Sequence, residues 1–137
     1  MNFKEQQENL INFITNNYEL HPEIITDVLD FDKYKNDFSL FVDFSRIDFR
    51  QSLYDDDCGD IEHLSIVFYL VRRNNTPAIL NADILDAAYL LYELIKEKPS
   101  LGIAQNTIIE SIDFYKYVEG TKYLVCSEFN LSLEIEI

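Results

Sequence analysis

Apolar residues recur at intervals of three and four between residues 3 and 18, with Asn, Gln and Glu between them. This spacing is typical of a helix that buries one face. It predicts an amphipathic helix that starts at Phe3 and ends near Asn16-Asn17. The sequence Leu20-His21-Pro22 then breaks the pattern, because a residue before proline avoids helical backbone. The stretch Glu23–Tyr34 fits either a short helix or an irregular packed segment.

From Phe38 onward the hydrophobic period changes to two, which predicts a strand. The apolar positions shift by one residue at Ile47, and such a shift exchanges the two faces of a strand. A β-bulge is therefore expected near Ser45-Arg46. A second strand, His63–Arg73, is apolar on both sides, so we expect it inside the sheet.

The clearest helix has its apolar stripe between Ile84 and Ile95, with Asn81 as the expected N-cap and Pro99 as its stop. Two further strands follow, Thr107–Val118 and Tyr123–Ile137. The segment Glu119-Gly120-Thr121 predicts a tight turn between them. The last strand alternates most cleanly and has a length of about 45–50 Å.

The order α-β-β-α-β-β predicts an α+β fold with an antiparallel sheet of about four strands and the helices packed on one face. The chain has 137 residues, of which 47% are hydrophobic. That is enough apolar material for one core, so residues 1–137 are expected to form a single domain.

The chain is strongly acidic, and this limits its expected partners. It has 11 Lys and Arg and 25 Asp and Glu, which gives a net charge of −14. Phosphate contacts need Lys and Arg, so nucleic acid and anionic lipid are not expected partners. The longest apolar runs are about six residues, whereas a membrane span needs roughly 20. The start of the chain is polar and lacks the apolar core of a signal peptide. We expect a cytoplasmic protein with two free thiols, Cys58 and Cys126.

The densest charge cluster follows the first long strand. It has three interpretations: a solvated hairpin tip, a protein-contact loop or a site for a divalent cation. It lacks the alternating carboxylates of an EF-hand loop, and we expect no metal or other cofactor. As candidate contact residues it contributes Asp55, Asp56, Asp57 and Asp60.

Catalysis is not expected from this sequence. His63 precedes Ser65 on the same strand face, but no nucleophile elbow or oxyanion hole accompanies them. His21 is a turn residue. Glycines only at 59, 102 and 120 exclude a glycine-rich phosphate loop. We therefore do not expect an enzyme.

The adjacent Arg72 and Arg73 end the second strand and are conspicuous among so few cations. They either pair locally with acids or meet carboxylates of a neighbouring subunit. Arg46 and Arg50, on the preceding strand, are expected to belong to the same basic edge. Aromatic residues are also abundant, with 10 Phe and 9 Tyr. Some should be exposed, because strands apolar on both faces exceed what one helix layer covers.

This element order, size and acidity resemble the tail-terminator and tail-completion (neck) proteins of tailed bacteriophages. The resemblance rests on architecture and not on a motif, so it transfers no residue roles. It implies a structural protein, encoded by a phage or prophage, that forms a ring at the end of the tail tube. Such rings are usually hexameric and join the tube to the head connector. The expected partners are thus other copies of the chain, the tail-tube protein and the connector, within the virion.

An alternative from another class is an acidic binding module of the immunity or inhibitor type, which covers a basic partner protein. Opposite charge would steer that association, and salt would screen it.

Overall fold

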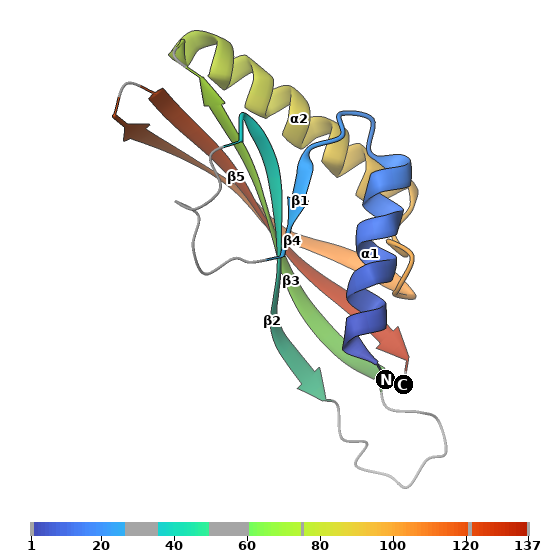
Figure 1. Ribbon diagram of the computed structural model, residues 1–137. Helices are drawn as coiled ribbons and strands as arrows, with labels where there is room; N and C mark the ends of the chain where they lie inside the picture. The colour runs from blue at the N-terminus through green and yellow to red at the C-terminus, as the bar shows by residue number, and fades with distance from the viewer. Residues whose placement is uncertain (1, 27–35, 50–60, 75, 121, 137) are drawn as a thin grey trace, which may run out of the picture.

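The computed structural model describes residues 2–26, 36–49, 61–74, 76–120 and 122–136. Its elements are α1 (Phe3–Asn17), β1 (Glu23–Ile25), β2 (Phe38–Phe49), β3 (Ile61–Asn74), α2 (Pro77–Glu97), β4 (Asn106–Glu119) and β5 (Lys122–Glu136). The strands form one sheet in the order β1-β2-β3-β5-β4 (Figure 1). The expected α+β class is confirmed.

The sheet is mixed and has five strands, which corrects the expected antiparallel sheet of about four. β1 runs parallel to β2, with Ile24 opposite Leu40, and the other three pairings are antiparallel. The short-helix or irregular interpretation is therefore wrong for residues 23–25, and residues 27–35 lie outside the described part. Three residues are too short for an alternating pattern to be recognised.

All four long strands expected from the sequence are present, as β2, β3, β4 and β5. The register of β2 against β3 shifts between Phe44 and Arg46, where the bulge was expected. β3 lies in the middle of the sheet, as its two apolar sides predict. β4 and β5 form a hairpin in which Glu119 pairs with Lys122. Gly120 has φ +62°, a left-handed conformation that suits a two-residue turn.

The second helix begins earlier than expected. α2 starts at Pro77, with Thr76 as its N-cap, so the prediction of Asn81 as the cap is wrong. Proline is well suited to the first helical position, because its fixed φ fits the helix and its missing N–H has no partner to lose there. The helix ends at Glu97, two residues before Pro99, as predicted.

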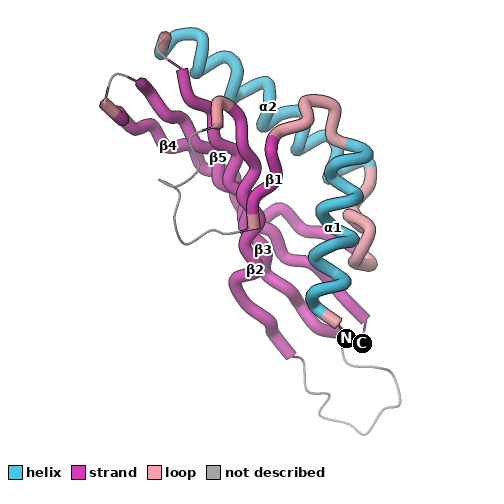
Figure 2. Tube along the Cα trace, in the orientation of Figure 1, coloured by secondary structure: helices cyan, strands magenta, loops and turns pink. Residues whose placement is uncertain are grey.

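Both helices pack on one face of the sheet and enclose the main core (Figure 2). Leu10 and Ile14 of α1 and Leu91 of α2 are almost fully buried there. The Tyr18 hydroxyl donates a 2.7 Å hydrogen bond to the Ala87 carbonyl and so ties the end of α1 to α2. No helix in the described ranges is long and apolar enough to cross a membrane.

We call the opposite side of the sheet the far face. It has a smaller buried cluster around Phe41 and Cys126. The helices do not cover the whole of the other side either. α2 packs on β3 and β5, and Phe114 and Val118 on the helix side of β4 are 43% and 74% exposed.

Candidate functional site

The arginine pair has local partners within the chain. The Arg72 guanidinium lies over the Phe38 ring, 3.8 Å from its centroid, in a cation–π contact. Arg73 is 3% exposed, and its Nη1 donates to the Asn36 carbonyl at 3.2 Å. The two side chains lie on opposite faces of the sheet, because neighbouring strand residues alternate. Contact of this pair with another subunit stays a prediction.

Arg46 does not share an edge with Arg72, so that expectation is wrong. Arg46 lies opposite Ser65, whereas Arg72 lies opposite Phe38, which precedes Arg46 by eight residues in β2. At about 3.4 Å per residue the two arginines are roughly 27 Å apart along the strand. Arg46 instead forms a 2.9 Å ion pair with Asp48, and both side chains are exposed. Such surface pairs contribute little to stability.

Several expected contact residues lie outside the described part of the chain. They are Arg50 and the acidic cluster with its neighbouring thiol: Asp55, Asp56, Asp57, Cys58 and Asp60. Within the described ranges, no three His, Cys, Asp or Glu side chains converge as a metal site would require.

Two side chains with catalytic potential are held in the sheet. The contact of His63 is with Ser132 on β5, and not with Ser65 on its own strand. Its Nδ1 lies 3.5 Å from the Ser132 hydroxyl. Cys126 is a free, buried cysteine. Burial, and secondarily the charge of Glu128, raise the pKa of its thiol to about 12. The thiolate needed for nucleophilic attack is therefore scarce at neutral pH.

The outer half of the far face combines exposed aromatic and acidic side chains on β4 and β5. Ile108, Tyr115 and Tyr117 are 45%, 42% and 56% exposed. We call these three residues together with Asp113 the β4 strip. The register places Asp113 directly opposite Glu128 on β5. Like charges in that position repel, so this surface favours a cationic partner group.

Glu128 is linked to the neighbouring tyrosines. It accepts a 2.9 Å hydrogen bond from the Tyr115 hydroxyl. This hydrogen bond, and then the charge of Glu128, raise the pKa of Tyr115. Burial, followed by the same charge, raises the pKa of Tyr69. Both tyrosines therefore stay protonated at neutral pH and present hydroxyl groups beside the carboxylate.

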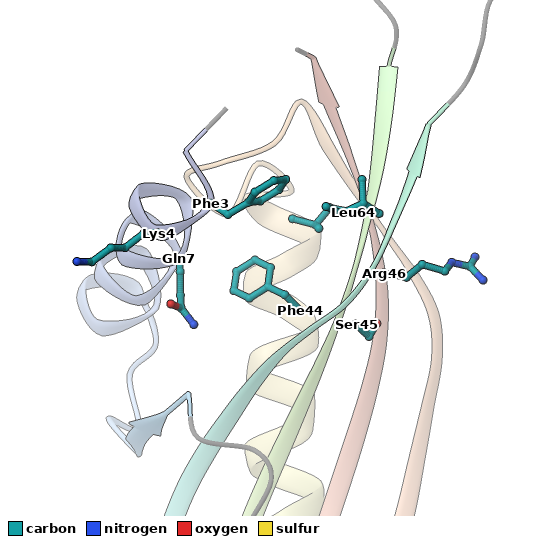
Figure 3. Close-up of a pocket in the computed structure, with 8 residues that line it drawn as sticks. Phe3, Lys4, Gln7, Phe44, Ser45, Arg46 and Leu64 are labelled. Carbon is teal, nitrogen blue, oxygen red and sulfur yellow. The ribbon is translucent and has the colours of Figure 1, made fainter.

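A groove of about 590 Å³ lies between the first half of α1 and the sheet, and we call it the α1 groove (Figure 3). Phe3 of α1 and Phe44 of β2 lie in the gap between helix and sheet, while Lys4 and Arg46 point outward on its two sides. The full lining is Phe3, Lys4, Gln7, Phe44, Ser45, Arg46, Ile47 and Leu64. Four of these eight residues are apolar, and none of them is an acid. Of the two cations, Arg46 is paired with Asp48.

Sequence reasoning expected some exposed aromatic residues but located neither surface, although one had a usable signal. Asp113 and Glu128 are equally far from the Gly120 turn, so a two-residue hairpin alone places them opposite each other. The α1 groove had no such signal, because it depends on where α1 lies against β2. A comparison with protein-family models and with curated protein sequences finds no match. The candidate function therefore depends on the surfaces themselves.

Proposed function

We propose that this chain is a structural, self-associating protein of a phage or prophage tail. In this proposal it forms a ring at the end of the tail tube, joins the tube to the head connector and has no catalytic role. The observation that carries the proposal is apolar surface exposed on both sides of one sheet. On α2 it comprises Ile79, Leu85 and Tyr89, which are 51%, 55% and 62% exposed. On the far face it is the β4 strip.

Exposed apolar patches on separate sides of the molecule favour assembly over a monomeric state. Soluble monomers rarely leave large patches of this kind uncovered. A single two-fold dimer uses the same patch on both copies, whereas a ring needs two different patches on each copy. Surfaces on α2, the α1 groove and β4 supply different patches.

The net charge is compatible with this role. DNA passes through a tail during injection, and a pore wall rich in Lys and Arg would bind its phosphates. A ring of chains that each carry −14 would repel the DNA instead. The helix–hairpin–helix–hairpin order, which the structure retains apart from the added β1, also supports the resemblance to the neck proteins.

The test is the molar mass of the purified chain, measured by size-exclusion chromatography with light scattering. Samples from low to high micromolar concentration are compared with and without a tail-tube protein. We expect a closed oligomer, alone or on the tube end. A monomer at all concentrations that forms no ring with the tube protein would overturn the proposal.

The acidic binding module is a second candidate, and the far face favours it. Asp113 and Glu128 with the tyrosines beside them match the groups that bind lysine and arginine side chains. This candidate predicts capture of a cationic protein at low salt and its release at high salt. No such partner in a low-salt pull-down would count against it.

A further inference from the structure

We propose that the β4 strip of one copy docks into the α1 groove of a second copy, in a head-to-tail contact. The inference rests on the proposed self-association and names the two surfaces that make it. The occupant of the groove is thus this same chain, presented by its opposite sheet edge.

The positions of the two surfaces support this arrangement. The α1 groove lies beside β2, and the strip lies on β4, which ends the sheet on the other side. β1 pairs only with residues 39–41 of β2, so Phe44 and Ile47 are beyond the reach of that pairing. A copy cannot bring its own two surfaces together across five strands. Two different surfaces on opposite edges give a heterologous contact, which closes into a ring or continues as a filament.

The shape and polarity of the two surfaces match. The groove is lined by Phe3, Phe44 and other apolar side chains, and Phe3 is 41% exposed. Its volume of about 590 Å³ falls in the range that accepts a drug-sized molecule. The rings of Tyr115 and Tyr117 are smaller than such a molecule. Aromatic side chains that fill a pocket are the usual anchors of protein interfaces.

The charges are complementary as well. Lys4 lies on the helix side of the groove, and none of the eight lining residues is an acid, although the chain holds only 11 cations against 25 acids. Arg46 does not contribute to this match, because it points to the opposite side of the sheet and pairs with Asp48. The strip carries Asp113 opposite Glu128. A cation from the next copy would relieve the repulsion between these carboxylates. In a chain of this net charge, self-association requires such local pairing, because the bodies of two copies repel each other.

The first experiment uses Phe3→Asp in the groove and Tyr117→Asp in the strip. The matched control is Tyr123→Asp, an exposed aromatic on the helix side of β5, opposite Val118 and outside every proposed patch. All three side chains are exposed, and circular dichroism and melting temperature check that each variant folds. We expect each of the first two to weaken self-association at least tenfold, measured by analytical ultracentrifugation, because either one places a charge in an apolar contact. Tyr123→Asp should leave self-association unchanged.

Mixing distinguishes a head-to-tail contact from every two-fold one. The Phe3→Asp variant keeps an intact β4 strip, and the Tyr117→Asp variant keeps an intact α1 groove. In an equimolar mixture the intact strip should dock into the intact groove and form a heterodimer. Assembly should stop there, because the two remaining surfaces carry the substitutions. Charge reversal gives a second route: Lys4→Glu and Asp113→Lys should each weaken assembly, and mixing them should restore it.

The outcomes separate this inference from the proposed function. If the wild-type chain assembles and these substitutions leave it unaffected, or if mixing restores nothing, the assigned surfaces are wrong while self-association stands. If the wild-type chain never assembles, with or without the tail-tube protein, both proposals fail.

Discussion

Replacing Asp113 by asparagine should stabilise the folded chain, although most substitutions destabilise proteins. Asp113 lies directly opposite Glu128 in the β4–β5 ladder, and both point to the far face. The Cβ atoms of such a pair are about 5 Å apart. For carboxylates about 6 Å apart in water, Coulomb's law gives a repulsion of roughly 0.7 kcal/mol. Salt at about 20 mM lowers this to roughly 0.5 kcal/mol, and about 1 M salt to roughly 0.1 kcal/mol.

The assay is urea unfolding at low micromolar protein concentration, in about 20 mM and about 1 M NaCl. Asp113→Asn should raise the free energy of unfolding by about 0.5 kcal/mol at low salt, and high salt should remove most of this gain. The matched control is Glu110→Gln, which removes one negative charge from the same strand. Glu110 lies at the β4 bulge and has no residue paired opposite it.

Comparison with this control separates the local repulsion from a general effect of lower net charge. An Asp113→Asn gain no larger than that of Glu110→Gln would refute the pairwise repulsion. A gain of equal size at both salt concentrations would also refute it, because solvent-exposed charges must be screened.

Three further predictions concern the fold. Tyr18→Phe removes the hydrogen bond to the Ala87 carbonyl and should lower the free energy of unfolding by about 0.5–1.5 kcal/mol. Tyr117→Phe, the exposed control, should leave it unchanged. Equal denaturation midpoints for the two variants would contradict the role of this bond. Gly102 and Gly120 both have positive φ, but only a Cβ at Gly102 meets another atom, at 3.2 Å from Phe13 Cβ. Gly102→Ala should therefore lower the melting temperature more than Gly120→Ala, which adds only about 1 kcal/mol of backbone strain. The reverse order would show that Phe13 on α1 moves aside at little cost. Burial raises the pKa of Cys126 to about 12 from an ordinary value near 9, so its contribution to stability is complete below pH about 9 and is lost as pH rises toward 12. Urea unfolding between pH 8 and 10.5 should thus show a shallower loss of stability for Cys126→Ala than for the wild-type chain, and identical slopes would contradict the shift.

Local patterns were sufficient to predict most of the sheet. Side-chain alternation is a property of consecutive residues, so β2, β3 and β5 and the bulge after Phe44 could be found without tertiary information. β1 could not, since three residues contain barely one period and their pairing with β2 joins segments far apart in sequence. The α2 start was misplaced for a different reason. Asn81 and Pro77 are both start signals, and only the structure shows that Pro77 begins the helix.

Of the two candidate surfaces, one could be inferred from local sequence and the other could not. The pairing of Asp113 with Glu128 follows from the hairpin turn at Gly120 and was therefore open to sequence reasoning. The same counting shows why Arg46 and Arg72 are distant, because antiparallel strands separate residues that lie unequally far from their turn. The α1 groove depends on how α1 packs against Phe44 and Leu64, which no local pattern specifies. Long-range packing, and not secondary structure, was the missing information.

Asp113 finally connects stability with assembly, because its two expected effects have opposite signs. In the isolated chain, its repulsion with Glu128 destabilises the fold. In the head-to-tail contact, the same carboxylate faces Lys4 beside the groove of the next copy, so assembly relieves the repulsion. Asp113→Asn should therefore make the monomer more stable and the oligomer weaker. A variant that gains stability and assembles as well as the wild-type chain would show that Asp113 does not face Lys4 across the contact.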